Sequence, residues 1–475
     1  MTARPRRHRP VRLLRALLTI VVTVLALVGC TAGPAQAAPW PQRPVVDLAY
    51  DVAPDLRSAT GRETVTFTPD LPICELVFRA WPNAPSPSRE GNALRVTDAT
   101  VDGRPTRPDV RPAGAPDGAP GTLVTLPLPA CVEAGRTVRA ELGFSLRLGE
   151  NADERLGTSP ATGTAWFGSG FPLLAWVRGQ GWVRDDAVRI PGETATSEEF
   201  RLDALRVTAP DGAAVSGVGR AEGTAPGPRP GTTTHTFRAD AVRDVSVAVG
   251  AYRVLEREVA GGTRLHLFTP VTGTRVPPER WAEEIDGALG RLEDLLGPVP
   301  RPDLWVAIAP SQSSGIEYDG ALQFGDTAPD ELPELAAHEL GHQWFYALVG
   351  NNQARDPWLD EAFVTYAQAR VTGTEGQYAL DDVPDRVRGD LGLPMAAWAD
   401  RGFGPYNTGV YTQGAAVQLA ARERAGAERF DEALRAYVAG NAHRVAVPAD
   451  VANAFGDLPA VIDLLTRAGA LPPPG

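Results

Sequence analysis

The sequence predicts a multidomain protein in which an N-terminal antiparallel β domain precedes an α+β domain. Its 475 residues are enough for two or three domains, and a composition of 43% apolar and 22% charged residues is globular. The 44 prolines and 49 glycines favour many turns and β-type connections. Helical periodicity is absent between about residues 45 and 255 and frequent after residue 277.

The predicted β domain covers residues 38–255. Its apolar runs are short, alternating or β-branched, and are separated by Pro, Gly and Asp turns, which is the pattern of strands. The runs lie at 45–52, 63–69, 75–81, 122–128, 138–148, 200–210 and 242–252.

The predicted α+β domain covers residues 256–475. Strands are expected at 264–270, 303–310 and 321–326. Helices are expected at 277–297, 330–350 and 355–373, with short helices after residue 412. In the first of these helices Trp281, Ile285 and Leu289 share one face, and Gly297 marks its end.

Residues 1–37 are typical of a signal peptide. Six arginines and no acidic residue precede an apolar run at 16–29, which is shorter than the roughly 20 residues of a spanning helix. Two cleavage signals compete: "LVGC" resembles a lipobox and would leave a lipidated Cys30, whereas "AQA" at 35–37 would release a soluble protein. Either cleavage predicts an exported protein, extracellular or a cell-surface lipoprotein; an uncleaved membrane anchor is the weaker alternative.

The net charge excludes some classes of binding partner, and the cysteine content predicts a disulfide. Removal of the leader changes the formal net charge from −12 to −18, which argues against nucleic acid and anionic lipid as partners. We therefore expect the protein to attach to a membrane only through a lipid anchor at Cys30. Cys74 and Cys131 remain after cleavage, and in an oxidising compartment an even pair predicts a disulfide. The alternative is two buried free thiols.

The stretch "HELGH" carries the chemistry. His338 and His342 are four residues apart and share one helical face, which is the spacing of two zinc ligands. Eighteen residues separate His342 from Glu361 on the next predicted helix, which allows a carboxylate to return as third ligand. Glu339 is then placed to act as general base. The alternative, a core helix with two satisfied histidines, leaves Glu339 and Glu361 unexplained.

With Glu361 following, this motif resembles the gluzincin zinc aminopeptidases of the aminopeptidase N and leukotriene-hydrolase type. "HELGHQWF" and "WLDEAFVTY" are similar to that family's two ligand-bearing stretches, and Thr365 agrees with it. "ELVFRAWPN" and "VRDVSVAVG" resemble parts of its N-terminal β domain. The resemblance implies a thermolysin-like catalytic domain, one Zn²⁺ per chain, and a secreted bacterial member without the family's large C-terminal helical domain.

Two further roles follow from the resemblance. "SGIEYDGALQF" occupies the place of the family's exopeptidase loop, so Glu317 is expected to bind the substrate's free α-amine, although Ile316 and Tyr318 depart from the usual neighbours. Tyr411, rather than Tyr406, fits the family's oxyanion-stabilising tyrosine. The strand at 321–324 is expected to offer backbone groups to an extended peptide.

The expected function is therefore that of a zinc aminopeptidase acting on peptides with a free N-terminus. Two alternatives stay open: a zinc endopeptidase of the same fold, if the altered loop admits longer substrates, and a catalytically inactive peptide-binding protein. The intact ligands and Glu339 argue against the last.

Overall fold

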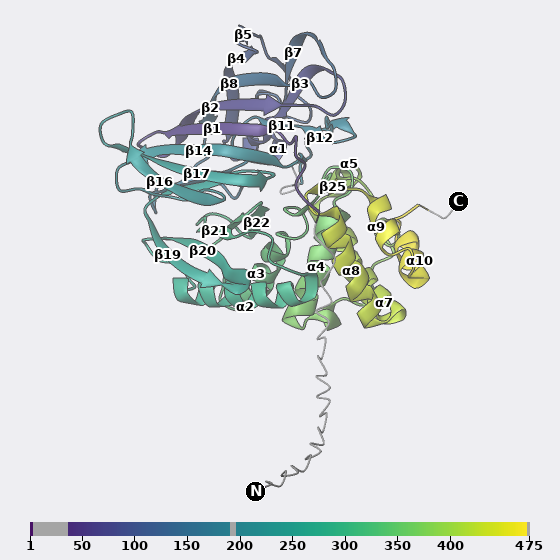
Figure 1. Ribbon diagram of the computed structural model, residues 1–475. Helices are drawn as coiled ribbons and strands as arrows, with labels where there is room; N and C mark the ends of the chain where they lie inside the picture. The colour runs from purple at the N-terminus through teal and green to yellow at the C-terminus, as the bar shows by residue number, and fades with distance from the viewer. Residues whose placement is uncertain (3–36, 191–195, 473–475) are drawn as a thin grey trace.

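The computed structural model describes residues 1–2, 37–190 and 196–472. It has the two-part architecture that the sequence predicts: the β-sheets of the first part lie over a smaller sheet with its helices, and the C-terminal helices lie at one side (Figure 1). The predicted signal peptide, with Cys30, lies outside the described residues apart from its two ends. The division at residue 255 stays a prediction; β19 (Tyr252–Val259) spans it and belongs to the second part's sheet.

The main sheet of the first part has eight strands in the order β16-β17-β14-β1-β2-β8-β4-β5. They are β1 (Val45–Val52), β2 (Ser58–Phe67), β4 (Ala93–Val101), β5 (Arg104–Pro105), β8 (Val138–Arg147), β14 (Phe200–Pro210), β16 (Arg220–Pro226) and β17 (Thr232–Val242). β1 pairs in parallel with β14, contrary to a purely antiparallel domain, because all of β2–β13 lies between them and supplies the long crossover that parallel pairing needs.

Two four-stranded sheets complete this part, in the orders β15-β18-β10-β9 and β11-β3-β7-β6. Their strands are β3 (Ile73–Arg79), β6 (Asp109–Arg111), β7 (Leu123–Val132), β9 (Leu156–Ser159), β10 (Thr164–Gly168), β11 (Leu173–Leu174), β15 (Ala214–Val215) and β18 (Ser246–Gly250). The predicted disulfide is confirmed: Cys74 on β3 is bonded to Cys131 on β7. Each of the seven predicted apolar runs overlaps a strand. The small elements are α1 (Pro85–Arg89), β12 (Trp176–Val177) and β13 (Gly181–Trp182).

The second part is built on a five-stranded sheet in the order β19-β20-β21-β23-β22. Besides β19, its strands are β20 (Thr263–Pro270), β21 (Asp303–Ile308), β22 (Gly315–Tyr318) and β23 (Ala321–Phe324). β23 pairs with β21 on one side and with β22 on the other, so its backbone groups are used within the sheet. The expectation that residues 321–324 offer a free edge is therefore wrong; on that side of the sheet the edge strand is β22, which follows β23 in the strand order.

The helix predicted at 277–297 is observed as α2 (Pro278–Leu296). Trp281, Ile285 and Leu289 are fully buried on its inner face. Gly297 follows it as the C-cap, with φ 104°. The apolar face and both ends were thus predicted correctly.

The helix predicted at 330–350 is shorter than expected, because α3 (Leu332–Gly341) ends at Gly341. His342 still has helical angles, φ −65° and ψ −11°, so it keeps its place one turn after His338. Beyond it the chain turns through Tyr346 at φ 102° and forms β24 (Val349–Asn351), which pairs in parallel with β25 (Arg444–Ala446). Pairing with a strand almost 100 residues away overrides the local helical pattern.

α4 (Trp358–Thr372) begins after Pro357 and ends at Gly373, as predicted. Every residue from Trp358 to Ala369 is buried, which makes α4 the central helix.

The predicted C-terminal helices are α7 (Gln413–Ala425), α8 (Ala427–Asn441), α9 (Pro448–Ala454) and α10 (Pro459–Arg467). Three further elements were not predicted from the sequence: α5 (Met395–Arg401), α6 (Phe403–Asn407) and a π-helical turn at Thr408–Thr412. No helix of the described residues is long and apolar enough to cross a membrane.

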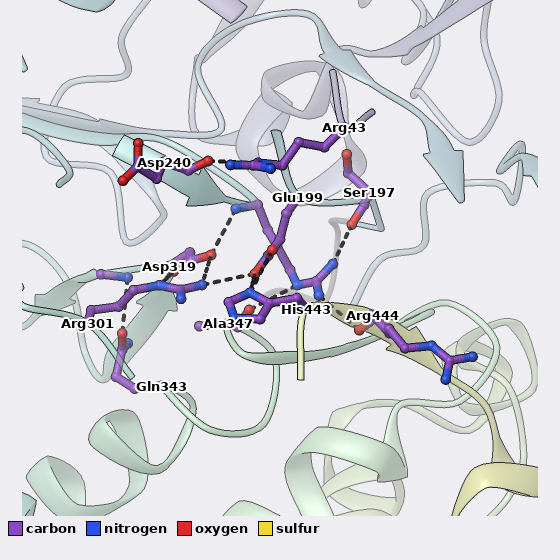
Figure 2. Close-up of polar contacts among 12 residues, drawn as sticks. Arg43, Ser197, Glu199, Asp240, Arg301, Asp319, Gln343, Ala347, His443 and Arg444 are labelled. Atoms are coloured by element: carbon purple, nitrogen blue, oxygen red, sulfur yellow. Dashed lines mark hydrogen bonds and ion pairs between the residues drawn. The ribbon is translucent and has the colours of Figure 1, made fainter. Parts of the chain in front are cut away.

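Buried ion pairs join the two parts (Figure 2). Arg301, before β21, donates to Asp319 in the β22–β23 turn at 2.6 and 2.9 Å and to Glu199, beside β14, at 3.1 Å. His443 Nδ1, just before β25, lies 2.9 Å from both oxygens of Glu199. Two buried carboxylates thus tie the large β-sheet to the β22–β23 turn and to the C-terminal segment.

Arg243 extends this network. Its backbone N–H donates to Asp319 Oδ2 at 2.9 Å. Its guanidinium donates to three carbonyl oxygens from different parts of the chain, those of Ser197, Ala347 and Arg444. Because each of these buried charges has an ionic or hydrogen-bonded partner, the interactions within the network offset its desolvation penalty and fix the two parts relative to each other.

These contacts set the charge state of Glu199. Burial by itself raises the pKa of Glu199, but the hydrogen bond with His443 and the charges of Arg243 and Arg301 lower it to about 2, against an ordinary 4.5. Because the pKa is depressed in the folded protein, ionised Glu199 stabilises the fold above pH 4.5. That contribution is lost as the pH falls toward 2.

We expect Glu199→Gln to lower the free energy of unfolding by about 3 kcal/mol at neutral pH, because His443 loses its buried carboxylate and Arg301 loses one of its two. The deficit should shrink as the pH falls below the ordinary pKa of Glu199. Denaturant titrations of chelator-treated protein at neutral pH and near pH 3 measure this. Asp463→Asn, which removes an exposed ion pair with Arg467, is the control and should cost less than about 1 kcal/mol. A deficit independent of pH contradicts the prediction.

Candidate active site and metal centre

The structure brings the three predicted metal ligands together. Glu361 Oε2, on α4, lies 3.3 Å from His338 Nε2 and 3.7 Å from His342 Nε2. The three ligand atoms all lie within 4.8 Å of one another. His342 and Glu361 are buried, and His338 is partly buried. The i, i+4 spacing on α3 and the return of the chain along α4 thus produce the convergence that the sequence predicts.

The far side of each imidazole is held by a hydrogen bond. His338 Nδ1 is 3.0 Å from Gln368 Oε1, and His342 Nδ1 is 3.3 Å from the carbonyl oxygen of Phe345. Since both partners are acceptors, each Nδ1 carries the proton and donates. The lone pair of each Nε2 is therefore directed toward Glu361, as in metal-binding histidines.

Both imidazoles are in the form that binds metal. Burial lowers the pKa of His338 to about 4, in spite of the hydrogen bond with Gln368. Burial and the neighbouring His338 lower the pKa of His342 well below its ordinary value. Two neutral imidazoles and one carboxylate, converging from two rigid helices, form the donor set of a catalytic zinc site with one position left for water or substrate. The residues fit a zinc ion.

Glu339 and Glu317 adjoin this centre. One oxygen of each lies within 4.8 Å of the other and of a ring nitrogen of His342, and both side chains are buried. β22 packs directly on Glu339: a Cβ at Gly315 would lie 2.4 Å from Glu339 Cγ. Gly315 is therefore a site residue that the sequence analysis did not single out, since only the packing of β22 on α3 reveals why a side chain is excluded.

Gln353, which the sequence did not single out, contacts Glu317 and links it to Asp360. Gln353 Nε2 donates to Glu317 Oε1 at 3.2 Å and to Asp360 Oδ2 at 3.1 Å. Asp360 precedes the ligand Glu361, and its Oδ1 accepts the backbone N–H of Glu361 at 2.9 Å. Gln353 lies in an irregular segment between β24 and α4, which carries no local sequence signal for this contact.

The two faces of β22 have different environments. Side chains alternate along a strand, so Glu317 faces opposite to Ile316 and Tyr318. Tyr318 is fully buried in the hydrophobic core of the β domain, and Ile316 packs against the same core. The ring of Tyr318 lies 5.6 Å from the Arg155 guanidinium and occupies space that a Cβ on Gly168 would fill. The two departures from the family's loop therefore lie on the face away from Glu339.

The two candidate tyrosines differ in position. The ring of Tyr411 stacks on that of His338 with centroids 5.8 Å apart and planes 11° apart. Tyr406 is fully buried and meets Tyr411 edge to face, with centroids 5.5 Å apart. Tyr411 belongs to the π-helical turn, a feature often found at functional sites. The structure thus brings Tyr411 to the metal ligands, while its role in catalysis stays a prediction.

Two of the three other histidines in the described residues contact protein groups. His266 stacks on Trp305 at 3.8 Å and lies 3.0 Å from Asp303. His443 is the partner of Glu199. Both belong to the framework around the site.

Comparison with known proteins agrees with this geometry. The chain shares its fold with an M1 zinc metallopeptidase from Deinococcus radiodurans: the TM-score is 0.62 at 20% sequence identity, over 93% of this chain and 96% of that one. A mutant of that protein bound to the substrate Tyr-Ser-Ala gives the same TM-score and identity, over 91% and 95%. The fold is that of the two-domain M1 zinc metallopeptidases, an N-terminal β-rich domain followed by an α+β domain.

Among curated proteins, Aminopeptidase M1-B of Oryza sativa subsp. japonica is 27% identical over 224 residues, covering 41% of this chain and 25% of that protein. The chain thus spans about a quarter of the length of the curated relatives it matches. No protein-family model matches the chain. The resemblance to the aminopeptidase N type, inferred above from the motif, is confirmed by these likenesses.

We expect Gln368→Ala to weaken zinc binding by about 10- to 100-fold, because His338 loses the acceptor that fixes its orientation and tautomer. Competition with a chelator of known affinity measures this. Gln418→Ala is the matched control: it truncates another buried glutamine, neither of whose amide atoms has a hydrogen-bond partner among the described residues. Equal zinc affinities in the two variants would show that Gln368 does not orient the ligand.

Proposed function

We propose that the chain is a zinc-dependent aminopeptidase, which removes N-terminal residues from peptides. One observation carries the proposal: Glu339 and Glu317 both lie beside the cluster of His338, His342 and Glu361, all on one side of β22. A general base next to a metal site and a second carboxylate within reach of it are the parts that hydrolysis at a free N-terminus requires.

Each side chain has a distinct task. When bound, zinc supplies Lewis acidity and lowers the pKa of water. The Glu339 carboxylate accepts a proton from the attacking water and returns it to the leaving amine. The Tyr411 hydroxyl donates a hydrogen bond to the oxyanion that develops at the scissile carbonyl. The Glu317 carboxylate pairs with the ammonium group of the substrate.

The edge strand supports binding of an extended peptide. Within the described part of the chain β22 pairs with β23 on one side and with no strand on the other, so that edge can form hydrogen bonds to a substrate backbone. Because Glu317 is on this strand, the same element would align the peptide and bind its N-terminus.

The endopeptidase alternative rested on the changed neighbours of Glu317. Ile316 and Tyr318 pack into the core of the β domain rather than toward Glu339, so their replacement does not open the amine subsite. The carboxylate of Glu317, which distinguishes an exopeptidase, is retained. These observations favour the aminopeptidase.

Export is part of the proposal. The Arg-rich leader with its apolar run supports export, and the Cys74–Cys131 disulfide is in keeping with an oxidising compartment. Lipidation at Cys30 and release after the A-x-A site remain the two proposed outcomes.

The central test is Glu339→Gln. We expect it to lower kcat/KM for free-N-terminal aminoacyl reporters by about 10²- to 10⁴-fold, because the general base is lost, while zinc content is unchanged. The parent should cleave these reporters in preference to N-blocked, internally quenched peptides. An unaltered rate in the variant refutes the mechanism, and activity confined to blocked peptides refutes the aminopeptidase in favour of the endopeptidase.

Tyr411→Phe tests the oxyanion role. Loss of one donor to the oxyanion should lower kcat by about 10²- to 10³-fold with a smaller change in KM. Tyr406→Phe, which removes the hydroxyl of the buried neighbour, should lower kcat by less than about tenfold. The reverse order of the two effects would assign the role to Tyr406. Steady-state kinetics on the same reporters provide both values.

A further inference from the structure

One buried amide connects the substrate-binding carboxylate to the metal-binding helix. Gln353 Nε2 donates to Glu317 Oε1 at 3.2 Å and to Asp360 Oδ2 at 3.1 Å. Glu317, Gln353 and Asp360 are 8%, 1% and 0% exposed, so these bonds form away from solvent. Hydrogen bonds to ionised acceptors in such surroundings are about twice as strong as those between neutral groups.

The two acceptors determine the orientation of the amide. Both contacts of Nε2 are with carboxylates, so the NH₂ group, and not the carbonyl oxygen, must face them. Each N–H then serves one carboxylate. The contact with Oε1 in turn limits rotation of the Glu317 carboxylate.

Asp360 transmits this constraint to the metal ligand. Its Oδ2 accepts from Gln353, and its Oδ1 accepts the backbone N–H of Glu361 at 2.9 Å. A continuous series of hydrogen bonds therefore runs from Glu317 on β22, through Gln353 and Asp360, to the first turn of α4. Glu361, at the end of this series, is the third metal ligand.

The backbone of β22 is fixed separately. Gln343, which follows the ligand His342, donates from Nε2 to the carbonyl oxygen of Tyr318 at 3.0 Å, and its Oε1 accepts the N–H of Gly320 at 3.0 Å. Gln343 thus positions the strand, whereas Gln353 contacts the Glu317 side chain itself. The task left to Gln353 is the orientation of the carboxylate.

We propose that Gln353 is a positioning residue, which orients the Glu317 carboxylate relative to Glu361 and so sets the distance between the α-amine subsite and the metal-binding residues. This inference rests on the proposed aminopeptidase function. An enzyme that removes one residue at a time needs that distance to match a single residue, because the ammonium group must reach Glu317 while the first peptide bond lies at Glu339.

A purely structural role makes a different prediction. If Gln353 only satisfied the buried Asp360, its loss would destabilise α4 and affect every substrate and the metal equally. A positioning role acts through Glu317. Its loss weakens the binding of the substrate amine in the ground state and in the transition state alike, which raises KM and leaves kcat nearly unchanged.

The experiment compares Gln353→Met, which keeps the length of the side chain and removes the donor, with Gln353→Asn, which keeps the amide and shortens its reach. On free-N-terminal aminoacyl reporters both should raise KM by about 10- to 100-fold, with kcat within about threefold of the parent. Zinc per chain should be unchanged. Gln418→Met is the matched control and should leave KM within about twofold of the parent. If one Gln353 variant does not fold, the other gives the same readout.

A double-mutant cycle with Glu317→Gln tests whether the change in KM caused by the Gln353 variants acts through Glu317. In the Glu317→Gln protein, Gln353→Met should change KM by less than about threefold, because its target is already lost. An unaltered KM in the single variants, an effect of the same size in the Glu317→Gln protein, or loss of zinc would each overturn the inference. A parent that cleaves only N-blocked peptides refutes the proposed function itself, whereas a parent active on free-amine reporters beside unaltered Gln353 variants refutes this inference alone.

Discussion

The packing of α3 against α4 is the constraint on which the site depends. Gln368 on α4 accepts the hydrogen bond from His338 on α3, and Phe345, in the segment just after α3, stacks on Phe363 of α4 with ring centroids 5.0 Å apart. Because α4 is buried along most of its length, it has no solvent-facing side and little freedom to rotate. Its Glu361 is therefore delivered to the two imidazoles by a rigid element, and the three ligands converge without relying on a loop.

The burial of α4 also explains the polar contacts around it. A helix buried on all sides does not tolerate an unpaired carboxylate, yet Asp360 and Glu361 both lie in its first turn. The imidazoles face Glu361, and Gln353 together with the N–H of Glu361 satisfies Asp360. The requirement to satisfy a buried charge thus produces the connection to Glu317. The proposed recognition of the substrate amine would therefore use the same hydrogen bonds that satisfy the buried Asp360.

The strand β22 contacts both parts of the protein. One face, with Ile316 and Tyr318, packs into the core of the β domain, and the other presents Glu317 beside the metal ligands. The β22–β23 turn is held by Arg301 and Arg243 through Asp319, and Arg301 also reaches Glu199 of the β domain. The β22 strand that carries Glu317 is therefore positioned by contacts with both parts of the protein.

Much of this protein follows from local sequence. The strand runs, the amphipathic α2, the ends of α4 and the His338, His342 and Glu361 set were predicted because periodicity, caps and i, i+4 spacing are properties of neighbouring residues. The end of α3, the edge position of β22 and the contacts of Gln353 were not, since each depends on partners distant along the chain. The sequence alone predicted that His338, His342 and Glu361 would converge, and the structure brings them together. The tertiary structure decided which strand lies beside the metal ligands at the edge of the sheet and which side chain contacts Glu317, because strand pairing and burial, not local propensity, choose among distant partners.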